Sequence, residues 1–177
     1  IEGTFFGSIV ASEKTAAAAG TIGELRRDPM AMLPFCGYNM AEYLKHWLRI
    51  GRKNVATPPA VFRVNWFRKD EHGRFIWPGF SENMRVLKWV VERCSGCGQA
   101  VESPLGWVPP HEAINWEGLD FDKKDFFHIM NIDREIARHE TVDQEELFTR
   151  FGDHLPREME LERELQLARL YLSLIHI

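Results

Sequence analysis

Long hydrophobic runs are absent from this sequence, and cysteine is scarce. No window approaches the roughly 18 consecutive apolar residues that a membrane-spanning helix needs, so no membrane span is predicted. A basic stretch followed by an apolar one is also missing after Ile1, and no signal peptide is expected. Three cysteines are too few, and odd in number, for a disulfide framework. A reducing compartment, most simply the cytoplasm, is therefore expected.

Several motifs that carry enzyme chemistry are missing as well. The sequence contains no G-x-x-x-x-G-K-[ST] phosphate loop, no H-E-x-x-H zinc motif and no recognised serine or cysteine nucleophile motif. Cys94 and Cys97 have the two-residue spacing of zinc and redox sites, but no second pair accompanies them, so free thiols are expected. Hydrolase functions have no support, and the phosphate loop that phosphoryl transfer uses is not found in these residues.

The charge pattern gives no sign of nucleic-acid binding. The net charge is −4, and residues 133–164 hold eleven acidic and five basic side chains. Because these acids are interleaved with leucine, phenylalanine and methionine, the stretch is expected to be a solvated helical face. No basic surface of the kind that binds nucleic acid is predicted.

The sequence has the length and composition of one folded globular domain. Its 177 residues, 45% of them hydrophobic, are enough for one sizeable core. Strands are expected at residues 3–10, 60–67 and 74–77, the last two joined by a turn at residues 70–73. The alanine-rich residues 11–23 fit either a short helix or a mobile loop.

Helices are predicted where apolar residues recur every three or four positions. They are expected from a cap at Asn39 to Gly51, from Glu82 to Cys94, over residues 122–130, after a capping box at Thr141, and after Pro156. A proline-containing connector is expected around residues 104–110. Two of these helices have apolar stripes expected to face the core, namely Met84, Leu87, Val91 and Cys94, and Leu161, Leu165, Ala168 and Leu172.

Residues 65–83 hold the densest group of candidate ligand-binding side chains. Five aromatic residues lie within residues 66–80, on the predicted hairpin and the loop that enters a helix. Aromatic rings can stack on a purine base, at about 1–3 kcal/mol per base. The amide of Asn83, at the helix start, can read the edge of the base. The residues alone leave an ordinary aromatic core as an open alternative.

These residues also carry a family resemblance. Residues 64–70 (VNWFRKD) and 75–83 (FxWPGFxEN) resemble the guanine-binding region of GTP-dependent phosphoenolpyruvate carboxykinases. Residues 12–18 (SExTAAA), 28–35 (DPMAMxPF), 37–39 (GYN) and 104–106 (PxG) match the same family in the same order. Residues 111–171 match only in helical character. The resemblance implies that the fold is the C-terminal part of that family's α/β fold, with a partial mixed sheet and a helical C-terminal section.

The resemblance implies a role for two groups of residues. Phe67, Phe75 and Phe80 would wall a guanine pocket, Asn83 would read the base edge, and Ser81 and Glu82 would contribute the backbone of the loop. The family's mobile lid would extend from residue 12 to about residue 23. Its named members are Ser12, Glu13, Lys14, Thr15, Ala16, Ala17, Ala18, Ala19 and Gly20. Lys14 would either approach substrate phosphate on closure or stay in solvent, and Ala11 stands where the family usually has a basic residue.

The resemblance also implies an activity. The intact enzyme would convert oxaloacetate and GTP to phosphoenolpyruvate, CO2 and GDP in gluconeogenesis, with Mn2+ at the transfer site and Mg2+ on the nucleotide. It would be a monomer without nucleic-acid or membrane partners. The phosphate loop, the manganese ligands and the oxaloacetate-binding arginines would precede this chain, which would itself hold no catalytic residue and no metal ligand. The alternative is a self-contained, non-catalytic nucleotide-binding or interaction module.

The expected domain organisation follows from the same resemblance. Residues 1–171 would form a partial C-terminal nucleotide-binding domain. Residues 172–177 (LSLIHI) fit the translated end of a sequencing adapter and are expected to be a non-native tail, so that the reading frame would be truncated at both ends. A short apolar extension of the last helix is the alternative for these residues.

Overall fold

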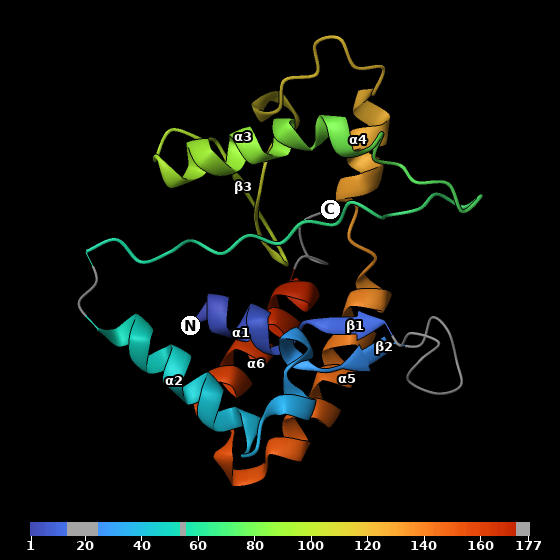
Figure 1. Cartoon of the computed structure of the whole chain (residues 1–177). Coiled ribbons are helices and arrows are strands. Elements are labelled where there is room, and N and C mark those ends of the chain that lie inside the picture. Colours follow the sequence, from blue (N-terminus) through green and yellow to red (C-terminus); the bar gives the residue numbers. More distant parts are fainter. Residues whose placement is uncertain (14–24, 54–55, 173–177) are drawn as a thin grey trace. The chain divides into compact units, whose positions relative to one another are not determined.

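The computed structural model describes residues 1–13, 25–53 and 56–172. The chain divides into two compact units, unit 1 (Ile1–Pro59 and Arg134–Ile177) and unit 2 (Ala60–Asp133), each of which is described by itself (Figure 1). The predicted α/β class is confirmed, since helices accompany two antiparallel two-stranded sheets in these ranges. No helix in the described ranges is both long and apolar enough to cross a membrane. Of the expected tail, residues 172–177, only Leu172 is among the described residues.

Unit 1 begins with helix α1 (Glu2–Ser8), so the strand predicted at residues 3–10 is wrong. Phe5 and Ile9, four positions apart, are both buried and belong to the core of this unit. The segment is helical because the face that carries Phe5 and Ile9 packs against a neighbouring helix. This packing outweighs the strand propensity of aromatic and β-branched residues. Gly7 permits the close contact, since a Cβ there would lie 2.9 Å from the ring of Trp47.

Strands β1 (Ala11–Glu13) and β2 (Leu25–Arg27) form the antiparallel sheet of unit 1 (Figure 1). Ala11 pairs with Arg27 at one end of the ladder. Arg27 binds the carboxylate of Glu140, and its Nη2 lies 3.4 Å from Oδ2 of Asp143. Both acids belong to helix α5 (Arg134–Phe151), so the strand that follows residues 14–24 is tied to a long helix.

The turn after β2 is built on a buried carboxylate. Asp28 is 1% exposed, lies 2.9 Å from the Arg26 guanidinium, and accepts a 2.9 Å hydrogen bond from the Leu33 backbone N–H. The short helices η2 (Pro29–Ala31) and η3 (Leu33–Phe35) follow it. The ion pair and the backbone bond compensate the cost of burying this charge.

Helix α2 (Met40–Arg52) confirms the prediction made from its cap. The Asn39 side-chain oxygen accepts a hydrogen bond from Ala41 N at 2.9 Å, and its amide nitrogen donates to the Phe151 carbonyl at 3.0 Å. Leu44 and Leu48 are buried one turn apart on the face that the spacing predicted. The cap therefore starts the helix and also joins it to the end of α5.

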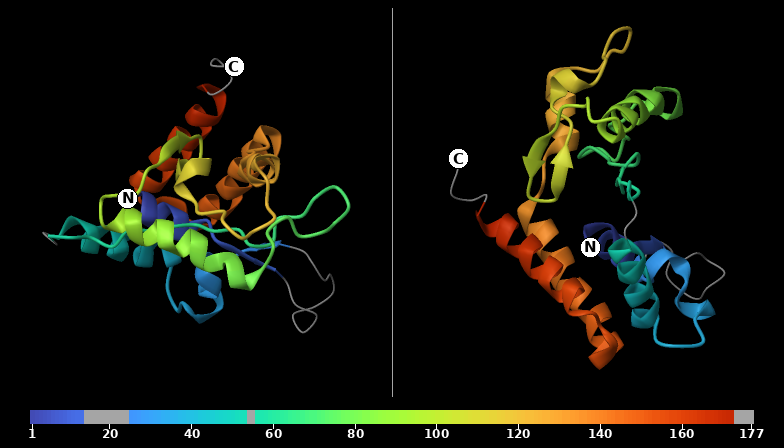
Figure 2. Two further views of the ribbon diagram at one scale, coloured as in Figure 1. Left: turned by 90° about the horizontal axis from the view of Figure 1, so that it is seen from above. Right: turned by 90° about the vertical axis from the view of Figure 1, so that its left-hand side faces the viewer.

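Helices α5 and α6 (Arg157–Leu172) complete unit 1 and lie side by side (Figure 2). The capping box predicted at Thr141 is wrong, because α5 passes through it. Thr141 is buried in the helix interior, and its hydroxyl donates to the Ala137 carbonyl at 2.8 Å, which satisfies the group that a cap would have used. Pro156, expected in the first turn of the last helix, lies immediately before α6. The core of unit 1 collects Phe5, Ile9, Met40, Ala41, Leu44, Leu48, Leu147, Phe148, Phe151 and Met159.

Unit 2 begins with a stretch that lacks the predicted strand. Residues 60–67 form no ladder, and the only pairing in this part of the described chain is an isolated bridge between Lys69 and Phe75. The segment is held by side chains instead. The Phe62 ring lies edge-on to Trp89 at 5.9 Å, and the Trp66 ring lies 6.0 Å from Trp77. The strand predicted at residues 74–77 does not form either, because Phe75 makes only the isolated bridge to Lys69.

Helix α3 (Asn83–Cys94) forms where it was predicted, after η4 (Phe80–Glu82), but with another face inward. Trp89 is its buried residue, and the Trp89 indole N–H donates to the Gln99 carbonyl at 2.7 Å. The stripe expected to be buried is exposed, as is the stripe predicted on α6. The exposed members of the two stripes are Met84, Leu87, Val91 and Cys94, and Leu161, Leu165, Ala168 and Leu172.

The predicted connector contains a second hairpin. Strands β3 (Val101–Ser103) and β4 (Gly106–Val108) pair antiparallel, with Gly106 at φ 121. The short helix η5 (His111–Ala113) follows, and then α4 (Lys123–Met130), whose cap Asp122 accepts from Asp125 N at 2.7 Å. The core of unit 2 consists of Trp77, Phe121 and Phe126, with Trp66, Ile76, Val86, Trp116, Leu119, Ile129 and Met130 packed around them.

Candidate nucleotide-binding site

A tight turn brings two of the predicted pocket residues together. Gly73 N donates to the Asp70 carbonyl at 3.0 Å, and Gly73 adopts φ 77, a conformation that glycine tolerates well. The chain returns so that Lys69 and Phe75 form their bridge. The rings of Phe67 and Phe75 consequently lie edge-to-face, with centroids 6.0 Å apart. The predicted turn is confirmed, although the strands beside it are not.

The carboxylate of Asp70 holds this turn. One oxygen accepts hydrogen bonds from the backbone N–H groups of His72 and Arg74, both at 2.9 Å. The other accepts from Arg74 Nε at 3.0 Å. These bonds, first of all the one from the Arg74 backbone, lower the pKa of the Asp70 carboxyl below its ordinary value. The group therefore stays ionised, and the turn intact, at neutral pH.

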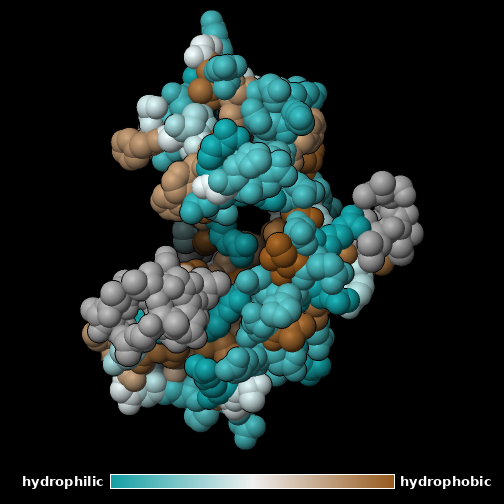
Figure 3. Space-filling model, turned by 90° about the vertical axis from the view of Figure 1, so that its right-hand side faces the viewer, coloured by the Kyte–Doolittle hydropathy of each residue, from teal (hydrophilic) through white to brown (hydrophobic). Residues whose placement is uncertain are grey.

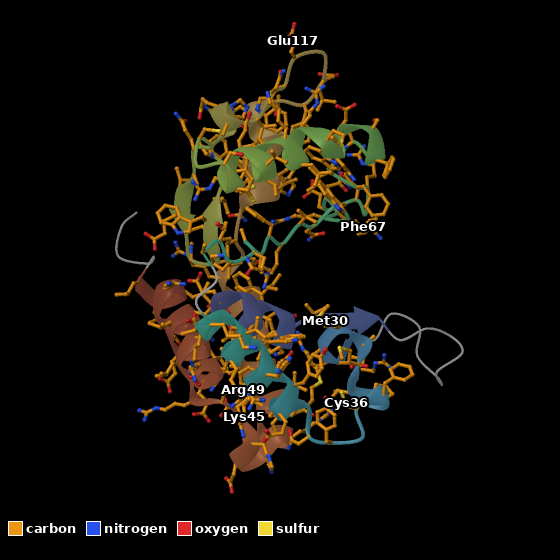
Figure 4. The ribbon with its side chains drawn as sticks, turned by 60° about the vertical axis from the view of Figure 1, so that its left-hand side comes forward. Met30, Cys36, Lys45, Arg49, Phe67 and Glu117 are labelled. Carbon is orange, nitrogen blue, oxygen red and sulfur yellow. The ribbon has the colours of Figure 1, made fainter. Side chains whose placement is uncertain are left out.

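The aromatic residues of this region separate into a core set and an exposed set. Trp77 is 6% exposed and Trp66 is half-buried, and both pack in the core of unit 2. Phe67, Phe75 and Phe80 are 72%, 57% and 91% exposed. The alternative of an ordinary aromatic core therefore describes the tryptophans and not the three phenylalanines. Figure 4 shows Phe67 at the edge of unit 2.

Exposed phenylalanines are costly unless something covers them. Burying such a side chain is worth about 1.5–3 kcal/mol relative to leaving it in water. Phe67 and Phe75 form one exposed apolar pair and Phe80 is a separate exposed ring, and all three are available to a ligand. Figure 3 shows that hydrophobic residues lie at the surface of the protein among hydrophilic ones. The described geometry brings Phe67 against Phe75, and no ring contact of Phe80 with either is present among the described residues.

Backbone geometry projects Phe80 away from the core. Gly79, just before it, has φ 127 and ψ −171, a region that is essentially restricted to glycine. Glu82 N donates to the Gly79 carbonyl at 3.1 Å and closes η4. Phe80 is the first residue of that short helix, and its ring lies outside the aromatic core of unit 2.

An arginine fastens the two residues that follow Phe80. The Glu82 carboxylate accepts from Arg85 Nε at 2.6 Å and from the Ser81 hydroxyl at 3.2 Å. Arg85 also donates to the carbonyls of Asn115 and Glu117, in the loop whose tip carries Glu117 in Figure 4. The Arg85 bond is the main cause that lowers the pKa of the Glu82 carboxyl, so the ion pair persists at neutral pH and is lost only as the pH falls through that lowered value.

Asn83 has a defined orientation at the start of α3. Its Oδ1 accepts a hydrogen bond from the Trp77 indole Nε1 at 2.8 Å. Trp77 itself is packed edge-on against Phe121, with ring centroids 5.7 Å apart. The residue predicted to read the base edge is thus fixed by a bond to the core.

The predicted lid lies largely outside the described residues. Ser12 and Glu13 lie in β1, where they pair with Arg26 and Leu25. Lys14, Thr15, Ala16, Ala17, Ala18, Ala19 and Gly20 are not among the described residues. Residues 11–13 form a strand, so both the helix and the loop expected there are wrong for these three residues.

Three residues of the site received no role from the sequence. Trp77 holds Asn83, Arg85 holds Glu82, and Lys69 places its Nζ 5.2 Å from the centre of the Phe75 ring, close enough for a cation–π contact. Arg85 three positions after Glu82 is a helical ion-pair spacing that could have been recognised. The Trp77 contact depends on how the loop folds back, which no spacing reveals.

The described residues do not offer a metal centre. Within residues 1–13, 25–53 and 56–172, no group of three or more His, Cys, Asp and Glu side chains could hold a metal ion. Cys94 and Cys97 are exposed free thiols, as predicted, and Cys36 is a half-buried one.

Comparison with known proteins assigns the chain to a family. The family model "Phosphoenolpyruvate carboxykinase C-terminal P-loop domain" matches residues 1–169. The chain is 46% identical over 169 residues to a protein of Arthrobacter sp. (strain FB24) named phosphoenolpyruvate carboxykinase (GTP). Proteins of the same name from Anaeromyxobacter dehalogenans (strain 2CP-1) and Thermoplasma volcanium are each 45% identical over 168 residues. Each match covers 95% of this chain and 28% of the relative.

Proposed function

Because the chain belongs to the GTP-dependent phosphoenolpyruvate carboxykinase family, we propose that it is the guanine-binding and lid-bearing part of such an enzyme. The enzyme converts oxaloacetate and GTP to phosphoenolpyruvate, CO2 and GDP and feeds gluconeogenesis. The chain spans 28% of the length of the relatives, which fits a part better than a whole. The exposed apolar stripes of α3 and α6 also fit a longer protein, because such surfaces are usually covered.

The guanine pocket is the observation that carries this proposal. Phe67, Phe75 and Phe80 are exposed beside a helix start, and the Asn83 amide is fixed there. Aromatic faces stack on any base, so the rings supply affinity. A neutral hydrogen bond to the base edge supplies discrimination. Ser81 and Glu82 contribute the loop backbone, which Arg85 holds in place.

The proposed lid extends from residue 12 to about residue 23. Small side chains allow such a segment to move at low cost, and a closed lid shields the reactive enolate of pyruvate from protonation by water. Strand β1 contains the first two residues of this segment, Ser12 and Glu13, and strand β2 begins after its end. The bonds from Arg27 to Glu140 and Asp143 attach the second end to α5, which gives a moving segment a fixed base.

Further parts of the proposal concern the whole enzyme. We assign Mn2+ to the transfer site and Mg2+ to the nucleotide, with ligands outside this chain, and the sequence holds no phosphate-loop motif. The enzyme acts as a monomer in the cytoplasm on GTP or GDP, oxaloacetate and phosphoenolpyruvate. Residues 1–171 are part of its C-terminal nucleotide-binding domain, and residues 172–177 are a non-native tail.

The second candidate function is a self-contained, non-catalytic nucleotide-binding or interaction module. The presence of a core in each unit favours it, since a packed core is what an independent domain needs. The genomic sequence upstream of Ile1 separates the two. An open reading frame with a phosphate loop supports the enzyme, whereas an in-frame stop followed by a start codon supports the module.

Replacing Asn83 by alanine tests the base-reading role. In the full-length protein that carries this sequence, Asn83→Ala is expected to weaken GTP binding by about 0.5–1.5 kcal/mol, the value of a neutral hydrogen bond. The preference for GTP over ATP should narrow, because adenine gains nothing from this contact in the wild type. Affinities for GTP, ITP and ATP in the folded variant measure it. An unchanged GTP-to-ATP ratio removes Asn83 from the proposed role.

Replacing Ala17 by glycine tests the lid. The extra backbone entropy of glycine, about 0.5–1 kcal/mol, must be overcome on closure, so turnover should fall while GTP affinity stays the same. Steady-state kinetics and equilibrium binding in the full-length protein separate the two effects. Amide exchange of residues 12–23 should also slow when both substrates are bound. Equal exchange rates with and without ligands contradict the lid.

A further inference from the structure

The contact between Trp77 and Asn83 fixes which end of the amide faces outward. An indole N–H is a donor only, so the group 2.8 Å away from Trp77 Nε1 has to be the amide oxygen of Asn83. The opposite orientation would put two donors against each other. The Asn83 amide nitrogen then points away from Trp77, and it makes no hydrogen bond to another residue in the described part of the chain. Two N–H donors are left for a ligand.

Outward donors suit one purine edge and not the other. At the six-position guanine carries a carbonyl oxygen, which accepts, whereas adenine carries an amino group, which donates. A donor that faces this position gains a hydrogen bond with guanine. With adenine it meets another donor, and an unpaired polar group is left at the contact.

We propose that Trp77 is a positioning residue that selects guanine over adenine, because it holds the Asn83 amide with its nitrogen toward the base. The inference rests on the proposed function, since it takes the base to lie at Asn83. It adds that discrimination depends on a side chain that touches no nucleotide. Without the indole, the Asn83 amide can rotate and offer either its oxygen or its nitrogen, and the distinction between the bases is reduced.

Trp77 is suited to this task because the core immobilises it. The residue is 6% exposed, and its ring contacts Trp66 at 6.0 Å and Phe121 at 5.7 Å. A hydrogen-bond donor packed against two other aromatic rings sets the partner's orientation rather than following it. Gly79 and Phe80 lie between Trp77 and Asn83, so the same loop carries the stacking ring and the orienting bond.

The first test is Trp77→Phe in the full-length protein that carries this sequence. The substitution keeps an aromatic ring in the core, but it removes the indole donor together with part of the indole volume, a loss of volume that the control variant below shares. Affinity for GTP and for ITP, which has the same oxygen, should fall by about two- to tenfold, while affinity for ATP stays or rises. In an Asn83→Ala background the same change should leave the GTP-to-ATP ratio unaltered, since the amide it orients is gone.

Trp116→Phe is the matched control. Trp116 lies in the same aromatic cluster, and its indole N–H donates to the His111 carbonyl at 2.8 Å, so this variant loses a part-buried indole bond like that of Trp77. It should lower the melting temperature and keep the GTP-to-ATP ratio. If Trp77→Phe has the same GTP-to-ATP affinity ratio as the wild type, the inference is overturned while the proposed function stands. A wild type with no preference for GTP over ATP overturns the proposed function and the inference together.

Asn83→Asp covers the case in which Trp77→Phe does not fold. One carboxylate oxygen can keep the bond to the Trp77 indole, and the other then turns an acceptor toward the base. The preference should shift from GTP and ITP toward ATP, whose amino group can donate to it. A variant that folds and still prefers GTP as the wild type does contradicts the inference, because donors facing the base would then be unnecessary.

Discussion

Phe80→Ala is expected to weaken GTP and ITP binding alike, by about 1–3 kcal/mol, which is the loss of one stacking contact and up to about a hundredfold in affinity. Phe80 is 91% exposed, so removing its ring leaves no cavity in the protein. The melting temperature should therefore stay close to that of the wild type. Stacking tolerates any base, and the ratio of GTP to ITP affinity should not change. Equilibrium binding of both nucleotides, with a thermal melt of each variant, provides the measurement.

Phe127→Ala is the control for this experiment. Phe127 is 56% exposed on α4 of the same unit and lies outside the proposed pocket, with Lys123 Nζ 5.8 Å from its ring centre. Its removal should change neither nucleotide affinity nor stability by much. If Phe80→Ala lowered the melting temperature and left GTP affinity intact, Phe80 would be a packing residue and would leave the pocket.

The sequence was most informative where structure depends on neighbouring residues. Asn39 caps α2 through a bond to Ala41, two positions away, and Asp122 caps α4 through a bond to Asp125, three positions away. Signals of this range can be read directly from the order of residues. The turn at residues 70–73 belongs to the same class, because its hydrogen bonds join positions two to four residues apart.

Predictions failed where contacts with residues far along the chain determine the local structure. The residues of α1 have strand propensity, but Phe5 and Ile9 pack together with Leu44, which lies far along the chain. The stripe of α3 was placed inward by its spacing, while the helix is oriented by Trp89, whose partners are Gln99 and Phe62. An amphipathic pattern gives the faces of a helix and does not say which one a neighbour covers.

The candidate site shows the same division between local and distant information. Its residues were predicted from a resemblance and from the chemistry of aromatic and amide groups. Trp66 packs in the core while Phe67 beside it is exposed, although no strand forms there. The Trp77 bond to Asn83 needs a particular fold of the loop and a particular orientation of the amide, and neither is written in the spacing.

The 177-residue chain by itself is expected to show no GTP-dependent decarboxylation of oxaloacetate. Transfer of the phosphoryl group needs backbone donors of a phosphate loop, a lysine and a metal around the triphosphate, all aimed at charge that develops in the transition state. The phosphate-loop motif does not occur in the sequence. Loss of a single cationic group from such a site costs about 10³–10⁵ in kcat, so loss of the whole set should bring the rate to the uncatalysed background.

A chimera separates this expectation from simple misfolding. The chain would replace the matching 169 residues of the Arthrobacter relative, to which it is 46% identical, so that the preceding part of that protein supplies what is missing. Release of CO2 and formation of phosphoenolpyruvate are then measured with GTP, Mn2+ and Mg2+ for the chimera and for the isolated chain. The chimera should be active, and Phe80→Ala within it should raise the KM for GTP. Activity of the isolated polypeptide would mean that these residues hold a complete reaction centre, and the division between base pocket and transfer site proposed above would be wrong.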